Sequence, residues 1–295
     1  MNERAGVLAG MLSCIFGGGA AVATRYLVHD LDPLALAAFR FGLGFFILLP
    51  LAIRERWPRG RDWIGVAFLG LLFFAFFFIL YNWALAYTTA AHGALALSVL
   101  PLVTMALAAL LGAERLTARK TTGVFIAIAG VAAALASGLV AAPSGAWRGD
   151  LIMAAATVCM ALYSIWSRPF VARSSPMGFL VAGMGIGSSA VIAVALLRGS
   201  FAPVTGLAAA QWGALLYLGA FGGAAAFWLW IWALQRATPT RVTATMTINP
   251  VAAGVFAALI LGEPFGLSLV LGVAAVLAGI SIAATEARGR DAAAT

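Results

Sequence analysis

The feature that most constrains the fold of this sequence is an internal duplication. At an offset of 149 positions, 19 of the 68 residues from 63 to 130 are identical to their partners. A chain this rich in Ala, Leu and Gly should match at roughly one position in ten by chance. The chain therefore consists of two copies of one unit. The matched residues include the pairs Pro101 and Pro250, Glu114 and Glu263, and Gly123 and Gly272.

The two copies also correspond upstream of residue 63, at an offset of 143 positions. Arg25 then pairs with Arg168 and Pro33 with Pro176, so the second copy carries about six extra residues between 198 and 205. We divide the chain into a first repeat, 1–147, and a second repeat, 148–295, which ends in a short tail.

The composition places both repeats in a lipid bilayer. Apolar residues make up 63% of the 295 residues and charged residues 9%, which is more apolar surface than a soluble core can bury. A membrane-spanning helix needs about 20 apolar residues. We predict an all-α polytopic membrane protein with ten transmembrane helices, five in each repeat. These helices are expected at 5–25, 34–53, 63–86, 89–112, 120–140, 150–171, 177–197, 212–235, 241–261 and 265–285.

The number of helices in each repeat determines how the two repeats are related. Because five is odd, the second repeat must enter the membrane from the face opposite to the first. The repeats therefore have inverted topology, which is typical of secondary transporters that rock around a site near the middle of the membrane.

The basic residues predict the orientation of the chain. The net charge is +8, and fourteen of the eighteen Lys and Arg residues fall on the side that carries both termini. By the positive-inside rule both termini are cytoplasmic, and we expect a bacterial inner membrane location. The excess charge then reports topology and not binding to nucleic acid. The first apolar segment is expected to be a retained helix and not a signal peptide.

Two matched pairs of residues suggest shared scaffold roles. Pro101 and Pro250 each remove a backbone hydrogen bond within a helix, which makes either a hinge or a static packing kink. Glu114 and Glu263 close the fourth and ninth predicted helices, on opposite faces of the membrane. Since Glu263 precedes Pro264, we favour a carboxylate at the start of the next helix over a role in coupling.

Three stretches of the sequence resemble a known family. They are LGAERLTARKTTGVFIAIAGV (111–131), INPVAAGVFAALILGEPFGLSLVLGVAAVLAGI (248–280) and DPLALAAFRFGLGF (32–45). They are similar to the repeat of the drug/metabolite transporter superfamily, the EamA-type ten-helix exporters, and Arg40 takes the place of a helix-2 arginine frequent in that family. The resemblance covers nearly the whole chain and implies secondary transport, with bacterial exporters of amino acids, including aromatic ones, as the most similar members. It departs at Ala113, which separates Gly112 from Glu114.

Polar and aromatic residues that differ between the copies are candidates for a substrate cavity, because polar groups cost free energy in lipid. Together they suit a neutral or aromatic amino acid or a related metabolite. For Trp166 the alternative is an interfacial anchor, and for the two asparagines it is hydrogen bonding between helices. For His92 the alternative is a solvated residue at the mouth. The candidates are Tyr81, Asn82, His92, Tyr163, Trp166, Thr247 and Asn249.

The first two helices carry two more unusual features. Arg40 is either a structural cation satisfied by carbonyls or a loop carboxylate, or a ligand for substrate. Gly17, Gly18 and Gly19 are expected to interrupt the first helix, and they either expose backbone to a ligand or allow close packing. Cys14 and Cys159 have apolar neighbours and no metal-ligand spacing, so we interpret them as packing residues.

Missing motifs narrow the functional class. No carboxylate lies in the central part of a predicted helix, so facilitated efflux is more plausible than antiport through a buried Asp or Glu. HExxH, GxSxG, paired intramembrane aspartates and a nucleotide-binding loop are absent from the sequence, which argues against an intramembrane enzyme and an ATP-driven pump. We expect a non-enzymatic secondary transporter that exports amino acids by alternating access, with drug-like solutes, nucleotide sugars or other metabolites as alternatives. We also expect no cofactor or metal, partners limited to solute and lipid, and a functional monomer.

Overall fold

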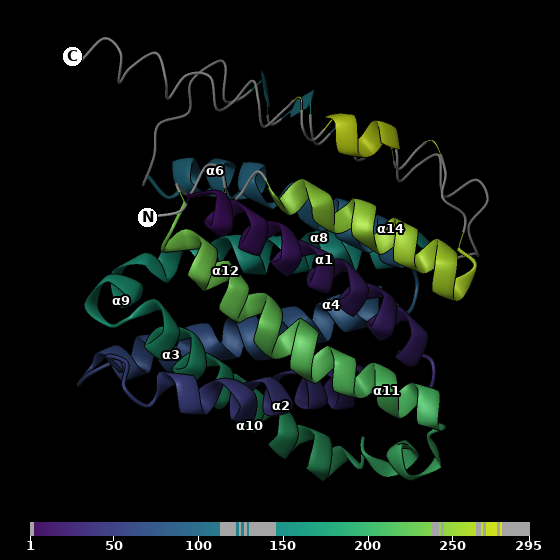
Figure 1. Ribbon diagram of the computed structural model, residues 1–295, viewed down its shortest axis with the longest axis horizontal. Helices are drawn as coiled ribbons and strands as arrows, with labels where there is room; N and C mark the ends of the chain where they lie inside the picture. The colour runs from purple at the N-terminus through teal and green to yellow at the C-terminus, as the bar shows by residue number, and fades with distance from the viewer. Residues whose placement is uncertain are drawn as a thin grey trace.

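Every regular element in the described part of the chain is a helix (Figure 1). The computed structural model describes residues 3–112, 122–123, 125–126, 129, 146–237, 242, 245–263, 267, 270–275 and 278. The all-α class predicted from the sequence is therefore confirmed.

The helices follow the order that the duplication predicts. The first repeat contributes α1 (Glu3–Leu27), α2 (Pro33–Ala52), α3 (Asp62–Gly70), η1 (Leu71–Phe77), α4 (Phe78–Ala84), α5 (Ala90–Ser98) and α6 (Leu100–Leu110). The second repeat contributes α8 (Ala146–Trp166), α9 (Arg168–Arg173), α10 (Pro176–Arg198), η2 (Ala202–Gly206), α11 (Ala209–Tyr217), η3 (Leu218–Ala225), α12 (Ala226–Leu234), η4 (Thr245–Thr247) and α14 (Ile248–Leu261).

Seven helical stretches in the described residues are long and apolar enough to cross a membrane. They coincide with seven of the ten predicted spans, and the shorter apolar helix α14 lies within an eighth, 241–261. The remaining two, 120–140 and 265–285, lie largely outside the described residues.

Side-chain caps fix the matching starts of α2 and α10. The Asp32 carboxylate accepts a hydrogen bond from the Leu34 amide at 2.7 Å, and the Ser175 hydroxyl accepts one from Gly178 at 3.0 Å. A proline follows each cap, where its missing N–H costs nothing and its fixed φ suits a helix. The same start signal is therefore present in both repeats.

A wider π-helical stretch interrupts the third helix of each repeat. The stretch η1 separates α3 from α4, and η3 separates α11 from α12. At the offset of 149 positions, η1 corresponds to residues 220–226, which overlap η3. The two stretches therefore occupy equivalent places in the two repeats. Such insertions often mark functional sites because they leave backbone groups free of the regular hydrogen-bond pattern.

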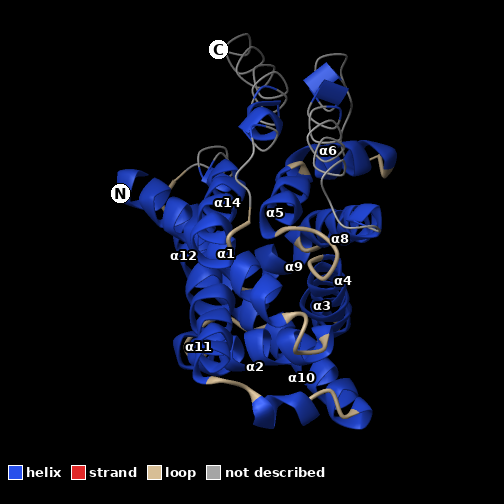
Figure 2. Cartoon of the chain, turned by 90° about the vertical axis from the view of Figure 1, so that its right-hand side faces the viewer, coloured by secondary structure: helices blue, strands red, loops and turns tan. Residues whose placement is uncertain are grey.

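The helices of the two repeats are interleaved. In the first repeat α1 packs against α12 and α14 of the second, and its counterpart α8 packs against α4, α5 and α6 of the first. Likewise α2 packs against η3, and its counterpart α10 packs against α3 and η1. Figure 2 shows α1, α12 and α14 on one side and α3, α4 and α8 on the other, and α5 between them contacts both α14 and α8. The packing is therefore preserved when the repeats are exchanged, as a two-fold relation requires.

Glycines allow the closest approaches between the repeats. A Cβ added at Gly44 of α2 would lie 3.0 Å from the Gly223 carbonyl carbon in η3. A Cβ added at Gly187 of α10 would lie 2.6 Å from the Cβ of Phe74 in η1, the residue at the position that corresponds to Gly223. Gly44 and Gly187 occupy matching positions in the two repeats, so the same tight helix contact is built twice.

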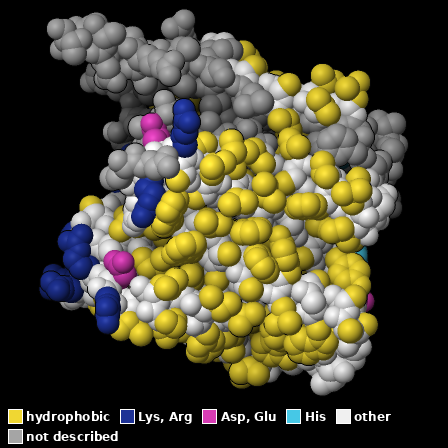
Figure 3. All heavy atoms as spheres, in the orientation of Figure 1, with side chains coloured by type: hydrophobic (Ala, Val, Ile, Leu, Met, Phe, Trp, Pro, Cys, Tyr) yellow, Lys and Arg dark blue, Asp and Glu magenta, His cyan; other side chains and the backbone are white. Residues whose placement is uncertain are grey.

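The outer surface suits a multi-pass membrane protein. Apolar side chains cover the face drawn in Figure 3, and Lys and Arg gather at one edge of it. Large apolar residues such as Ile64 and Leu197 are 74% and 89% exposed. Arg54, Arg56, Arg59 and Arg61 are exposed in the loop that follows α2. Their cytoplasmic location stays a prediction.

Candidate functional site

The candidate site contains a buried arginine between the two repeats. Arg40 is the eighth residue of α2, about 10 Å along the helix at 1.5 Å per residue, and its side chain is 6% exposed. Its Nη2 donates a hydrogen bond to the Gly222 carbonyl of η3 at 3.2 Å. Its Nε and Nη1 have no acceptor among the described residues. One carbonyl partner is thus present, and the expected loop carboxylate is absent from the described residues.

Two aromatic rings of the first repeat contact this guanidinium, and a ring of the second repeat packs against one of them. The Arg40 Cζ lies 4.6 Å from the Phe78 ring centroid and 5.5 Å from that of Phe41, which places the cation over ring faces. The rings of Phe41 and Phe78 are 4.3 Å apart, and the Phe227 ring of α12 lies 6.1 Å from Phe41. We call Phe41, Phe73, Phe74, Phe77, Phe78, Tyr81, Tyr163 and Phe227 the aromatic cluster.

Two predicted cavity residues belong to this cluster. Tyr81 of α4 is 5% exposed, and its ring lies 5.8 Å from that of Phe78. Tyr163 of α8 stacks on Phe73 at a centroid distance of 4.3 Å. Residues 82 positions apart in the sequence are therefore joined by a continuous set of ring contacts.

Asn82 follows Tyr81 and links two helices. Its amide nitrogen donates a hydrogen bond to the Pro33 carbonyl at 3.0 Å, which ties α4 to the start of α2. The side chain is 1% exposed, and its Oδ1 has no donor among the described residues. This hydrogen bond between helices is the alternative role that the sequence suggested for Asn82. It leaves the Oδ1 atom without a donor among the described residues.

The glycines of α1 do not interrupt the helix, so that prediction was wrong. The helix α1 runs unbroken from Glu3 to Leu27, and its glycines are instead the positions where other helices approach. The amide of Asn249 covers Gly17, and the hydroxyl of Tyr217 covers Gly19. The Tyr217 hydroxyl also donates to the Phe16 carbonyl at 3.4 Å. The close-packing alternative explains these glycines because their small size admits bulky neighbours.

The described contacts of Trp166 and Asn249 lie outside the aromatic cluster. Trp166, at the end of α8, is 39% exposed and lies 6.1 Å from Phe68, which is itself 55% exposed, a placement that favours the interfacial anchor. The side-chain amide of Asn249 lies against Gly17 of α1. Thr247 ends η4, and its side chain lies outside the described residues.

Both matched prolines lie just after a break in helical structure. Val99 separates α5 from α6, and Pro101 is the second residue of α6. In the second repeat the turn η4 precedes α14, and Pro250 is the third residue of α14. The breaks are therefore repeated at equivalent places, and the hinge role of the prolines stays a prediction.

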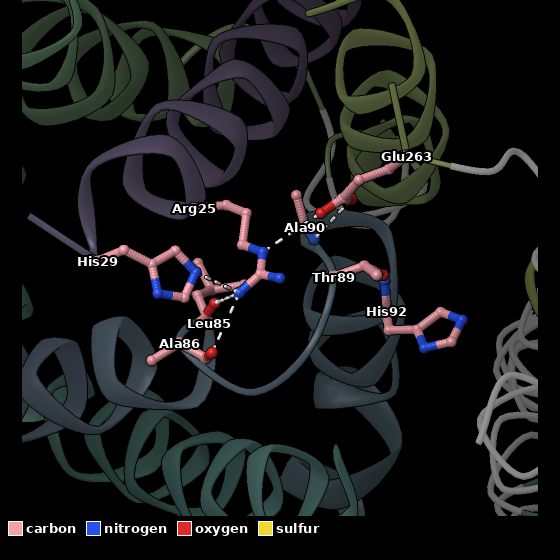
Figure 4. Close-up of polar contacts among 8 residues, drawn as sticks. All are labelled: Arg25, His29, Leu85, Ala86, Thr89, Ala90, His92 and Glu263. Atoms are coloured by element: carbon pink, nitrogen blue, oxygen red, sulfur yellow. Dashed lines mark hydrogen bonds and ion pairs between the residues drawn. The ribbon is translucent and has the colours of Figure 1, made fainter. Parts of the chain in front are cut away.

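A charged cluster joins the repeats at the predicted outer face (Figure 4). The Arg25 Nε lies 3.3 Å from the Glu263 Oε1, and the two side chains are 21% and 14% exposed. Arg25 also donates to the carbonyls of Leu85 at 2.7 Å and Ala86 at 3.1 Å, just after α4 ends. Glu263 Oε2 accepts from the Ala90 amide at 3.3 Å, where α5 begins. The pair thus caps both helix ends of one loop.

The histidines of this cluster have different positions. The Nε2 of His29 lies 3.1 Å from the Nη1 of Arg25. Because a guanidinium nitrogen can only donate, the Nε2 of His29 accepts this hydrogen bond. The backbone amide of His92 donates to the Thr89 hydroxyl at 3.2 Å in the first turn of α5. Its imidazole points away from the Arg25–Glu263 pair in Figure 4.

Glu263 was predicted as a scaffold residue, but its partner Arg25 was not predicted. We expected Glu263 at the start of the tenth helix, whereas its described contacts lead to Arg25 and α5. The start of the tenth helix and Glu114 lie outside the described residues. The one sequence signal that could have indicated a role for Arg25 is that the second repeat carries an arginine, Arg168, at the matching position.

Comparisons with known proteins match the sequence of this chain to one family. The model of the EamA-like transporter family matches residues 4–136 and again 147–285. An uncharacterized transporter of Bacillus subtilis, YyaM, is 25% identical over 90% of this chain and 89% of its own. An uncharacterized transporter of Archaeoglobus fulgidus is 26% identical over 92% of this chain and 95% of its own.

A solved crystal structure shares the fold. It covers 97% of this chain and 98% of its own chain, with a TM-score of 0.68 and 22% sequence identity. The family match accounts for the repeat, because its two parts fall on the two halves of the sequence.

Proposed function

The chain belongs to the EamA-like transporter family, and we propose that it exports neutral or aromatic amino acids, or related small metabolites, by alternating access. It does so from a bacterial inner membrane, with both termini in the cytoplasm. Drug-like solutes, nucleotide sugars and other metabolites are the alternative substrates. The chain acts as a transporter and not as an enzyme, and one copy is sufficient.

The Arg25–Glu263 ion pair carries the proposal. It joins the two repeats at the predicted outer face, so it must separate if they move apart there. Its exposed fractions of 21% and 14% leave it within reach of water, which limits the cost of separating the charges. A contact of this kind suits a transporter whose two faces open in turn.

The repeat supplies the same two charges at the cytoplasmic face. The counterpart of Arg25 is Arg168 and that of Glu263 is Glu114, as the two offsets give. Glu114 lies outside the described residues, so this correspondence rests on the sequence. Alternating access through inverted repeats predicts that each face carries its own version of the contact.

The aromatic cluster supports the proposed substrate class. Its rings offer apolar faces at the contact between repeats, while Arg40 and Asn82 add a cation and a free amide oxygen. A small solute with an apolar side chain and charged groups fits such a lining. Amino acids combine both properties.

The carboxylates of the described residues lie in loops or within the first two turns of a helix, as Asp62, Asp150 and Glu263 illustrate. A proton relay through a buried carboxylate in mid-membrane therefore has no candidate among them. We propose that the solute moves down its own gradient without coupled protons.

The test is solute counterflow in proteoliposomes that contain the purified protein. Vesicles loaded with an unlabelled amino acid should accumulate the labelled form from outside, and protein-free vesicles should not. The panel should include neutral, aromatic and charged amino acids, one nucleotide sugar and one cationic drug. Accumulation of the last two in place of amino acids would replace our substrate class with the alternative.

A further inference from the structure

We propose that Arg40 binds the carboxylate group of the transported solute. The substrates are then small organic acids with an apolar portion, amino acids included. This inference rests on the proposed transport function and names the chemical group that the site recognises.

The charge balance around Arg40 is the first argument. The described residues supply one carbonyl, that of Gly222, and the faces of Phe41 and Phe78, but no anion. The titratable side chains that act electrostatically on Arg40 are two neutral phenols, Tyr81 and Tyr217. A buried guanidinium is expensive in a low-dielectric interior unless an opposite charge accompanies it. The missing anion must come from elsewhere, and a bound solute can provide it.

The free hydrogen-bond donors of Arg40 determine the kind of anion. Among the described residues Nη2 alone has an acceptor, so the Nε hydrogen, both Nη1 hydrogens and the second Nη2 hydrogen remain available. A planar guanidinium matches the two oxygens of a carboxylate in geometry and charge. The aromatic rings beside it suit the apolar remainder of the same molecule.

The second repeat is built without a charge at the matching position. Position 183 corresponds to Arg40 at the offset of 143, and it is a glycine. In contrast Gly42 and Gly44, which follow on the same helix, are matched by Gly185 and Gly187. The packing residues are thus repeated while the cation is present once, as expected for a group that serves the substrate.

The position of Arg40 connects it to the motion of the repeats. Its guanidinium bonds to η3, so the contact crosses from one repeat to the other. A Cβ added at Gly222 would lie 2.8 Å from Ala20 of α1 and 3.5 Å from the Arg40 Nε. A solute that binds here therefore touches the interface along which the repeats separate.

The experiment compares solutes that differ only in the carboxylate. Counterflow by the purified full-length protein is measured for labelled phenylalanine, phenylalaninamide and phenethylamine. We expect transport of phenylalanine and little of the other two, which lack an anion and bring a positive charge towards Arg40. The affinity of Arg40→Gln for phenylalanine should fall by about tenfold to a hundredfold, because a charge-assisted contact is lost. Arg40→Lys should retain part of the affinity.

Two controls separate recognition from folding. Arg198→Gln removes an exposed arginine at the end of α10 and should transport like the wild type. The comparison of the three solutes uses the wild-type protein, so it holds even if Arg40→Gln fails to fold.

The outcomes distinguish this inference from the proposed function. Equal transport of phenylalanine and phenylalaninamide by the wild type, or unchanged phenylalanine affinity in folded Arg40→Gln, would overturn the role of Arg40 alone. No flux of any solute in the wild type would overturn the transport function together with it.

Discussion

Arg25 of the first repeat and Glu263 of the second are joined by an ion pair of 3.3 Å that also caps the two helix ends of the loop between α4 and α5. The same two side chains therefore hold the repeats together and stabilise a loop of the first repeat. Because both side chains take part in the ion pair, we expect their contributions to stability to be coupled. Because they make different further hydrogen bonds, we expect these contributions to differ in size.

A double-mutant cycle measures that coupling. We expect Arg25→Gln to lower the thermal stability in detergent more than Glu263→Gln, because Arg25 also donates to the carbonyls of Leu85 and Ala86. The coupling energy should be on the order of 1 kcal/mol for a partly exposed pair. Strictly additive effects of the two substitutions would show that the ion pair contributes nothing.

Two glycines, Gly18 of α1 and Gly213 of α11, should respond in opposite ways to substitution by alanine. A Cβ at Gly18 would lie 2.8 Å from both the Ala252 Cβ and the Ala253 nitrogen, so Gly18→Ala should lower the free energy of unfolding by about 1–3 kcal/mol. Gly213 of α11 has no atom within 4 Å of such a Cβ, and Gly213→Ala should raise it by up to about 1 kcal/mol. Chemical unfolding of both variants checks the signs, and equal effects would refute the packing explanation.

The predicted cavity residues Asn249 and Trp166 should respond differently to truncation. Asn249 lies at the contact between α14 and α1, whereas Trp166 is 39% exposed on the outer surface. We expect Asn249→Ala to reduce counterflow severalfold and Trp166→Ala to leave its rate within about twofold of the wild type. A larger loss in Trp166→Ala than in Asn249→Ala would return Trp166 to the substrate path.

Transport should not require a proton gradient. Counterflow at equal pH on both sides should proceed at the same rate with and without a protonophore, since no described carboxylate lies in mid-membrane. If solute moves only when a pH gradient is imposed, the proposal of uncoupled efflux fails.

Much of the fold was predictable because hydropathy and duplication are strong signals. Helix starts at Pro33 and Pro176 follow from local capping chemistry, and the helix class follows from apolar length. The unbroken α1 was not predicted because three successive glycines weaken a helix in isolation, while packing against α14 and Tyr217 compensates for this.

The candidate site was predictable only in part. Tyr81 and Tyr163 were predicted as cavity candidates, yet nothing in their spacing indicates that Phe73 and Phe78 connect them. The partner of Glu263 comes from a helix 238 positions earlier, and such long-range pairs are set by tertiary packing. The repetition of both charges was visible in the sequence, but their contact was not.

The most direct test of alternating access uses the Arg25–Glu263 contact as a reversible lock. Cys14 and Cys159 are both free, so they are first replaced by Ser, and then Arg25→Cys and Glu263→Cys are introduced together. A short reducible thiol-to-thiol cross-linker joins the two positions, and each single-cysteine variant serves as a control. We predict that cross-linking abolishes counterflow and that a reducing agent restores it, with both controls unaffected. Undiminished counterflow in the cross-linked protein would contradict a transport cycle in which the repeats separate at this face.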